Sequence, residues 1–216
     1  MLNYVNPKSY FFVGDIRQTI YEWRNSRPDI LFGMMQNPEV TVYQLQYNYR
    51  NSTEIISFAR NIIEKLGTKY KDNTIPMRKN RGFIIQMKYN IDKIADKILY
   101  SKGDFKDWFI LTRSNEQLKD IFNALTSMGI PCETFKKADL DNATLREKLN
   151  HDTVKVLTIH AAKGLEAKNV VVVGAFLRPQ DEESYRIAYV AATRAKDLLI
   201  WCGKPQKAKS QITNWE

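Results

Sequence analysis

The sequence lacks the two elements with which a nucleotide-hydrolysing protein usually holds its substrate. None of its 216 residues belongs to a Gly-x-x-x-x-Gly-Lys-Ser/Thr loop, whose backbone amides cradle phosphates, and no strand ends in the Asp-Glu pair that would hold magnesium. Lys163-Gly164 comes nearest to such a loop, but Ala161-Ala162 precede it, so the pattern fails. The chain is therefore predicted not to hydrolyse a nucleoside triphosphate by itself.

Cysteine and histidine are also scarce. Cys132 and Cys202 share no metal-ligand spacing, and His151 and His160 lack partners arranged as in a zinc site. We therefore expect no metal site, and two small buried cysteines in a reducing compartment. Residues 1–7 lack a charged start followed by an apolar stretch, and no apolar run approaches the ~18 residues needed to span a bilayer. A cytoplasmic protein without a membrane partner is expected.

Positive charge is in excess. The 33 Lys and Arg residues outnumber the 24 Asp and Glu residues, which gives a formal net charge of +9. Such a charge favours a polyanionic partner, because each phosphate that Lys or Arg neutralises releases condensed counterions. A nucleic acid is therefore a candidate partner, although an excess of this size is also common in ordinary basic proteins.

Short β-branched or aromatic runs alternate with helical periodicity along most of the chain. The strands predicted from these runs are 10–13, 40–43, 83–87, 108–111, 154–158, 170–173 and 198–201. The predicted helices are 51–66, which begins at Asn51 as N-cap, 91–100, 118–128 and 182–192. Continuous apolar strands separated by helices indicate a parallel sheet covered on both faces. The predicted fold is an open α/β sheet.

Three stretches do not fit this alternation. Residues 65–81 are polar and contain Gly67 and Pro76, which predicts a surface connection or a weakly ordered insertion. Residues 136–152 are also polar. Residues 1–39 cannot build a core alone, so they are predicted to be the end of a domain whose beginning is absent.

Residues 14–24 carry the first group of chemically informative side chains. They place Gln18, Tyr21, Trp23 and Arg24 close together after a predicted strand. A Gln near a strand end can hydrogen-bond a γ-phosphate or its attacking water, and aromatic and guanidinium planes can stack on unpaired bases. Alternatively, Tyr21 and Trp23 are core residues, since an isolated aromatic pair usually packs inside.

Two arginines occur in the same setting. Arg50 follows Asn48-Tyr49 and Arg194 follows Thr193, each beside a predicted strand and helix. The planar guanidinium fork matches phosphate oxygens, and two such groups closing from one domain onto a nucleotide held by another would sense a triphosphate. Each arginine could instead belong to a structural ion pair.

Four segments together resemble the motifs of superfamily 1 DNA helicases of the UvrD, PcrA and Rep type. Residues 14–24 resemble the third motif, with Asn25-Ser26 in place of the family's Gly-Ala and with Ile16-Arg17 where the family often has a small or acidic pair. The other matches follow in the family's order: 48–52 the fourth motif, 108–114 and 129–131 a linking strand and turn, 156–166 the fifth motif, and 182–195 the sixth.

This resemblance implies a RecA-like open parallel sheet with helices on both faces. Residues 1–39 would end the first RecA-like domain and residues 40–216 would form the second. The stretch between Phe135 and Val154 leaves no room for the large accessory insertion often found before the fifth motif. The family's phosphate loop and magnesium carboxylates precede the third motif, so the chain resembles the carboxyl-terminal half of such a helicase.

The resemblance also implies roles for individual residues. The implied cofactor is ATP with Mg²⁺, which this chain would share with an absent amino-terminal half and would not bind tightly alone. The implied catalytic residues are Gln18, Arg50 and Arg194. The implied ATP-binding residues are Tyr49, Gly164 and Glu166. Tyr49 would stack on adenine, Glu166 would bond the ribose, and the arginines would grip the γ-phosphate. Toward single-stranded DNA, the implied residues are Tyr21, Trp23, Arg24, Thr158 and His160. Taken alone, His160 would be a structural histidine.

The predicted function is that of the carboxyl-terminal part of an ATP-dependent DNA helicase or translocase. Its partners would be single-stranded DNA and an amino-terminal helicase half that carries the phosphate loop. The alternative is a non-enzymatic DNA-binding or regulatory module that retains the fold. Arg50, Arg194, Gln18 and Glu166 favour the first interpretation, because a pure DNA binder has no need of nucleotide-sensing groups.

Overall fold

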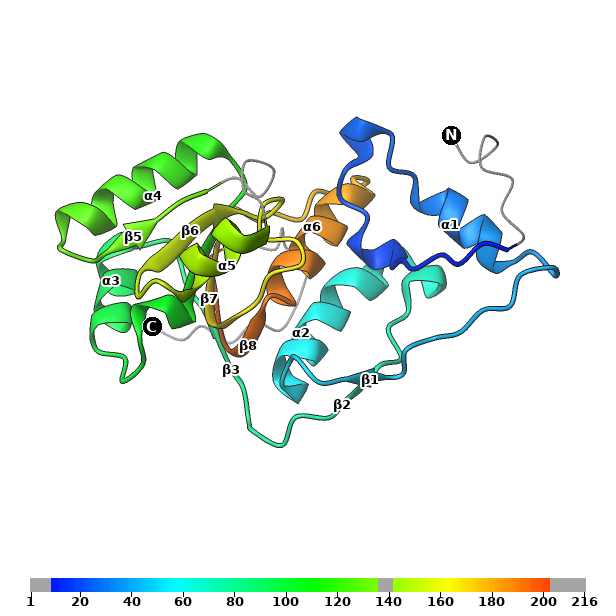
Figure 1. Cartoon of the computed structure of the whole chain (residues 1–216), viewed down its shortest axis with the longest axis horizontal. Helices are drawn as coiled ribbons and strands as arrows, with labels where there is room; N and C mark the ends of the chain where they lie inside the picture. Colours follow the sequence, from blue (N-terminus) through cyan, green and yellow to red (C-terminus); the bar gives the residue numbers. More distant parts are fainter. Residues whose placement is uncertain (1–8, 136–141, 203–216) are drawn as a thin grey trace.

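The computed structural model describes residues 9–135 and 142–202, apart from the side chains of Trp23 and Asn142. Predictions that concern the remaining residues, including the beginning of the polar stretch 136–152, lie outside the described part. Figure 1 shows a sheet with helices on both faces and, to its right, an arm formed by residues 9–48. This arm contains α1 (Pro28–Met35), none of whose residues is buried.

The main sheet is parallel throughout. Its order is β3-β8-β7-β4-β6-β5, and every neighbouring pair runs in the same direction. The strands are β3 (Phe83–Gln86), β4 (Trp108–Thr112), β5 (Cys132–Glu133), β6 (Val154–Thr158), β7 (Ala167–Val173) and β8 (Ala195–Trp201). This arrangement confirms the predicted open parallel α/β fold. The short strand β5 adds an edge that the sequence pattern did not indicate.

Side chains alternate between two core clusters, one on each face of the sheet. On β4, Phe109 and Leu111 belong to one cluster, whereas Trp108 and Ile110 belong to the other. The helices α2 (Thr53–Ile63), α5 (Asn142–Asn150) and α6 (Glu182–Ala192) contribute to the first cluster, and α3 (Ile91–Leu99) and α4 (Asn115–Ser127) to the second. Because both faces are covered, the middle positions of the strands are mostly apolar.

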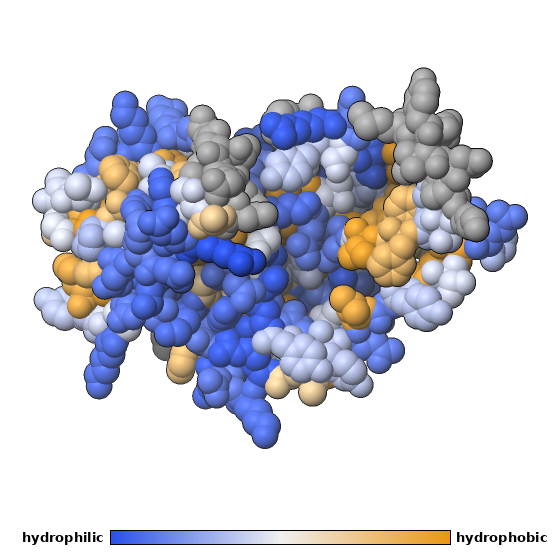
Figure 2. Space-filling view, viewed as in Figure 1, coloured by the Kyte–Doolittle hydropathy of each residue, from blue (hydrophilic) through white to orange (hydrophobic). Residues whose placement is uncertain are grey.

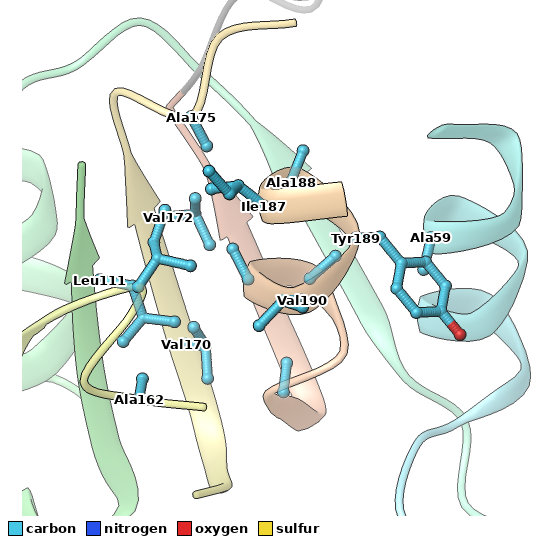
Figure 3. Packing of buried hydrophobic residues seen from close by; sticks show 14 of the residues in the cluster. Ala59, Leu111, Ala162, Val170, Val172, Ala175, Ile187, Ala188, Tyr189 and Val190 are labelled. Carbon is cyan, nitrogen blue, oxygen red and sulfur yellow. The ribbon is translucent and has the colours of Figure 1, made fainter. Parts of the chain in front are cut away.

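The helix α6 packs directly on the central strands. Figure 3 shows Leu111 of β4 and Val172 of β7 in the same cluster as Ile187 and Val190 of α6. All of these side chains are at most 1% exposed. Since α6 runs in the opposite direction to the strands, its amino end lies near their carboxyl ends and its last turn near their amino ends.

The helix α2 begins one residue later than predicted. Its N-cap is Ser52, whose hydroxyl accepts a hydrogen bond from the amide of Ile55. Asn51, the predicted cap, is buried, and its side-chain amide donates to the carbonyls of Thr193 (3.0 Å) and Ala195. A contact between distant segments therefore takes the side chain that local pattern assigned to the cap.

Two predicted strands are wrong. Residues 10–13 and 40–43 have irregular backbone, and Phe11 is 88% and Tyr43 86% exposed. Figure 2 shows hydrophobic surface on this part of the molecule. A strand requires a neighbour for its backbone groups, and neither segment finds one among the described residues. The nearby pair is instead β1 (Tyr47–Asn48) with β2 (Ile75–Pro76).

The connection between α2 and β3 is not merely a surface loop, as its polar composition predicted. It contains the short helices η4 (Glu64–Leu66) and η5 (Thr68–Tyr70) as well as β2. Tyr70 and Asp72 are buried within it because both bind α6. The hydroxyl of Tyr70 donates to Glu182 (2.8 Å), and Asp72 accepts from the hydroxyl of Tyr189 (2.9 Å).

Both cysteines are free, and only Cys202 is fully buried as predicted. Cys132, on the short edge strand β5, is half-buried. Among the helices of residues 9–135 and 142–202, none combines the length and apolar character that crossing a bilayer requires.

Removing side-chain volume from the centre of the sheet should lower stability strongly. Leu111 is fully buried on β4, so Leu111→Ala is expected to reduce the free energy of unfolding by about 2–5 kcal/mol. The control Leu99→Ala makes the same change at a side chain that is 50% exposed and should cost less than about 1 kcal/mol. Urea unfolding measures both, and equal losses would contradict this core assignment.

Candidate functional site

Arg50 and Glu166 form the centre of a charged cluster at the amino ends of β7 and β8. Arg50 lies between β1 and α2, and its Nε donates to the carboxylate of Glu166, which immediately precedes β7. The other carboxylate oxygen of Glu166 is 2.6 Å from Nζ of Lys196, on β8. Burial would raise the pKa of Glu166, but the hydrogen bonds from Lys196 and Arg50 hold it below its ordinary value. Glu166 is therefore an anion shared by two cations.

Arg194 lies beside this cluster and is bound by uncharged groups. It is 1% exposed, and its guanidinium donates to the carbonyls of Val190 (3.0 Å) and Leu165 (3.1 Å) and to the hydroxyl of Thr193 (3.1 Å). In the described part of the chain no carboxylate forms an ion pair with it. Burial, together with the nearby charge of Arg50, lowers the pKa of Arg194 to about 10. A buried cation without a counterion favours an added anion.

The sequence left open whether each arginine senses a phosphate or belongs to a structural ion pair, and the two arginines differ in this respect. Arg50 is part of an ion pair, whereas Arg194 is held by neutral groups. Lys196 was missed in the sequence because it lies one position beyond the sixth motif, and its basic character was the only available signal. With Lys196, two cations contact the carboxylate of Glu166, and the charge of Arg194 lies nearby.

Tyr49 and Gly164 flank the cluster. The ring of Tyr49 is 71% exposed, and its centre lies 6.4 Å from that of Tyr47 with the planes tilted by 55°. Gly164 has a φ of +85°, in the left-handed region that favours glycine, within the connection from β6 to β7. The structure therefore leaves one aromatic face open near Arg50 and a sharp turn just before Glu166.

A second group of predicted residues lies at the opposite ends of the strands, beyond the carboxyl end of β6. The hydroxyl of Tyr21 donates to the carbonyl of His160 (3.0 Å), and the two rings lie 5.5 Å apart. Nε2 of His160 lies 2.9 Å from the carbonyl of Ile20, so it must carry the hydrogen. Lys163 Nζ binds the carbonyl of Gln18 (2.8 Å) and lies 5.3 Å from the ring centre of Tyr21. These contacts bind residues 16–24 to the β6–β7 connection.

The remaining predicted DNA residues surround this group. Thr158 ends β6, and its hydroxyl accepts from the amide of Ala161 (3.2 Å). Arg24 is exposed in the short helix η3 (Glu22–Arg24). Tyr21 is half-buried and packs against the core, so it is neither a fully exposed base-stacking residue nor a fully buried core residue. The side chain of Trp23 is outside the described part.

Gln18 belongs to the short helix η2 (Ile16–Gln18) at the same ends of the strands. Its side-chain amide donates to Asp15 (2.9 Å) and not to a group of the Arg50 cluster. The predicted residues therefore form two groups, one around Glu166 and one around His160, and Gln18 belongs to the second.

Arg186 is a structural residue that sequence analysis quoted only as part of a motif. Its side chain is fully buried, Nε donates to the carbonyl of Thr19 (2.8 Å), and Nη1 donates to the hydroxyl of Tyr70 (2.9 Å). Nη2 pairs with the carboxylate of Glu22, and Glu182 lies 3.2 Å from Nη1. Its position one turn after Glu182 on α6 was the only sequence signal for this network.

Comparisons with known proteins agree with these motifs. A sequence model of the family described as the UvrD-like helicase C-terminal domain matches residues 43–140 and 135–203. A probable DNA helicase of Mycoplasma pneumoniae is 28% identical over 213 residues, which cover 88% of this chain and 37% of that protein. The ATP-dependent DNA helicase Rep of Buchnera aphidicola subsp. Schizaphis graminum is 26% identical over 193 residues, which cover 78% and 29%. The chain thus spans about a third of the length of these relatives.

A solved structure supports the fold. The C-terminal domain of a possible DNA helicase from Lactobacillus plantarum superposes with a TM-score of 0.51 and 18% sequence identity. The superposition covers 73% of this chain and 88% of that domain. At this identity the similarity concerns the arrangement of strands and helices.

The half-buried position of His160 predicts a pH-dependent stability. Burial lowers the pKa of His160, so near pH 6 the unfolded chain binds more protons than the folded chain, and stability rises with pH. The contribution should be intact above the unfolded pKa, about 6.5, and be lost as the pH falls toward the lower folded value. His160→Gln keeps a donor for Ile20 but cannot titrate, so it should lose less stability between about pH 7.5 and about pH 5.5.

Urea unfolding at the two pH values measures this difference. His151→Gln is the matched control, because it removes the other histidine and should retain the part of the fall that belongs to His160. An identical fall in wild type and His160→Gln would show that His160 is not the titrating group.

Proposed function

Since the chain belongs to the UvrD-like helicase C-terminal domain family, we propose that it supplies the carboxyl-terminal half of the motor core of an ATP-dependent DNA helicase. The observation that carries this proposal is the convergence of Arg50 and Arg194 beside Glu166, where Arg194 is buried and no carboxylate of the described residues pairs with it. A site built in this way has positive charge available for an anion that comes from outside the chain.

The charged cluster around Glu166 fits the phosphate end of ATP but not its magnesium ion. The charge of Arg50 and Arg194 would offset the negative charge that spreads over the γ-phosphate oxygens in the transition state. Across residues 9–135 and 142–202, no group of three or more His, Cys, Asp or Glu side chains could hold a metal. The phosphate loop and the magnesium carboxylates would come from the amino-terminal half. Bound there, ATP supplies the phosphoryl group whose transfer to water drives the motor.

Each residue of the cluster would hold a different part of the nucleotide. Arg50 would exchange its contact with the Glu166 carboxylate for one with a phosphate oxygen, which would free one oxygen of Glu166 for a ribose hydroxyl while Lys196 retains the other. Tyr49 would stack its exposed ring on the adenine. The turn at Gly164 would let the backbone approach the nucleotide closely. The carboxylate that Arg50 and Lys196 share supports the role given to Glu166.

Single-stranded DNA would bind at the opposite ends of the strands. Tyr21, Trp23 and Arg24 would stack on unpaired bases, and Thr158 and His160 would lie near the DNA backbone. Gln18 would couple the phosphate to this surface. The net charge of +9 and the exposed Arg24 support binding to a polyanion.

Reconstitution with an amino-terminal half that carries the phosphate loop tests the role of the arginines. The chain alone should hydrolyse ATP no faster than buffer, and the pair should show DNA-stimulated hydrolysis. Arg50→Lys and Arg194→Lys each keep the charge but lose the bidentate fork, so each should lower kcat by at least about tenfold while DNA affinity stays nearly unchanged.

Arg146→Lys, on the exposed side of α5, is the matched control and should retain full turnover. The measurements are the steady-state ATPase rate and the DNA affinity of a complex verified by co-elution. Full turnover in both site variants would favour the alternative, a DNA-binding module without a catalytic role.

DNA binding by the isolated chain gives a separate test. If Trp23 stacks on a base, Trp23→Ala should weaken binding to single-stranded DNA by about 1–3 kcal/mol, and the affinity should fall with added salt. Tyr100→Ala removes an aromatic ring that is 85% exposed after α3 and should have no effect. Fluorescence anisotropy with a labelled oligonucleotide measures both variants, and equal affinities would return Trp23 to the core interpretation.

A further inference from the structure

The two predicted sites lie at opposite ends of the strands, so a structural connection between them must run along the strands. The group around His160, proposed to bind DNA, lies beyond the carboxyl end of β6. The cluster around Glu166, proposed to bind the nucleotide, lies at the amino ends of β7 and β8. Helix α6 spans this distance in the reverse direction (Figure 1). A continuous series of polar contacts follows the same course.

The series begins at Gln18. Its side-chain amide donates to Oδ2 of Asp15 (2.9 Å), and Oδ1 of Asp15 accepts from Nε of Arg17 (2.8 Å). Nη1 of Arg17 in turn lies 3.0 Å from Oδ1 of Asp72. Asp72 belongs to the connection between η5 and β2, which carries none of the family motifs.

The second half of the series runs from Asp72 to Arg194. The hydroxyl of Tyr189, on α6, donates to Oδ2 of Asp72 (2.9 Å). The carbonyl of Tyr189 accepts from the hydroxyl of Thr193 (2.9 Å), and this hydroxyl accepts from Nη2 of Arg194 (3.1 Å). Asp72 is therefore the point where the η2 segment and α6 meet.

Burial restrains the second half of this series, whereas Asp15 and Arg17 in the first half are partly exposed. Asp72 is 4%, Tyr189 5% and Arg194 1% exposed. Burial would raise the pKa of Asp72, but hydrogen bonds from Thr74 and the charge of Arg17 hold it below its ordinary value, so the carboxylate stays ionised. Burial raises the pKa of Tyr189, which therefore remains a donor. Charged hydrogen bonds away from water are strong, and breaking one leaves an unsatisfied buried group.

Separate contacts keep the same segments together if this series is broken. Arg186 binds the carbonyl of Thr19 and the carboxylate of Glu22 from the first half of α6, and Ile20 is fully buried in the core. None of these contacts involves Asp72. Loss of the Asp72 contacts should therefore loosen the connection without releasing residues 16–24.

We propose that Asp72 is a positioning residue that transmits displacement between Gln18, at the DNA end of the strands, and Arg194, at the nucleotide end. This inference rests on the proposed function. DNA that shifts η2 moves Arg17 and Asp72 with it, and Asp72 carries the shift through Tyr189 to the last turn of α6. Asp72 itself contacts neither DNA nor nucleotide.

Hydrogen exchange on the chain alone tests the mechanical part of the proposal. Asp72→Asn keeps the shape but removes the charge, and Tyr189→Phe removes only the hydroxyl. Each should raise the exchange rates of the Gln18 and Arg194 amides by about tenfold, and the double variant should exceed neither single variant, because both changes break the same series. Asp107→Asn, which removes the partner of Lys168, is the control and should leave both amides unchanged.

The reconstituted pair tests the functional part. Asp72→Asn and Tyr189→Phe should lower the ratio of kcat with DNA to kcat without DNA by at least about fivefold, while the DNA-independent rate and the KM for ATP stay within about twofold. A purely structural role would instead change all three together or none. If Asp72→Asn fails to fold, Tyr189→Phe alone decides both experiments.

The two proposals can fail separately. A wild-type pair without DNA-stimulated hydrolysis overturns the proposed function, and the exchange experiment then judges the polar series alone. Normal stimulation in folded variants of an active pair overturns the role of Asp72. Faster exchange at Gln18 with no change at Arg194 overturns it as well.

Discussion

The burial of α6 from Arg186 to its last residue is the constraint on which the rest of the structure depends. Its apolar residues, including Ile187 and Val190, cover the central strands, and the polar side chains of Arg186 and Tyr189 are buried on the same helix. Buried polar groups need partners. Residues 16–24 and the connection that holds Tyr70 and Asp72 supply them, and this requirement fixes both segments against the helix.

The two buried arginines, Arg186 and Arg194, differ in whether a carboxylate of the described residues pairs with them. Arg186 contacts two carboxylates, those of Glu22 and Glu182, so its charge is compensated within the chain. Among the described residues, Arg194 donates only to neutral acceptors, and burial lowers its pKa to about 10. Replacing a buried arginine that pairs with carboxylates leaves those carboxylates without a partner and destabilises the fold. A buried arginine that pairs with no carboxylate can still bind an anion. This difference assigns a structural role to the first and supports a sensing role for the second.

Sequence patterns were most reliable where burial is complete. The strands around Ile110, Val156 and Val171 contribute apolar residues to both core clusters, and the helix at 182–192 has the predicted bounds. The patterns failed where a segment depends on a distant partner. Residues 10–13 are as apolar as a strand but have no neighbouring strand in the described structure, and Asp72 is buried within a largely exposed polar stretch because Tyr189 of α6 binds it.

By itself the sequence determined the parallel sheet, the order of the family motifs and the identity of the residues in them. Only the tertiary structure decided that Glu166 is shared by Arg50 and Lys196, and that Arg194 has no carboxylate among the described residues. It also decided that Asp72 joins η2 to α6. Periodicity and propensity report the burial of a residue relative to its own element. Charge pairing instead depends on distances between residues far apart in the chain, which only the packed structure sets.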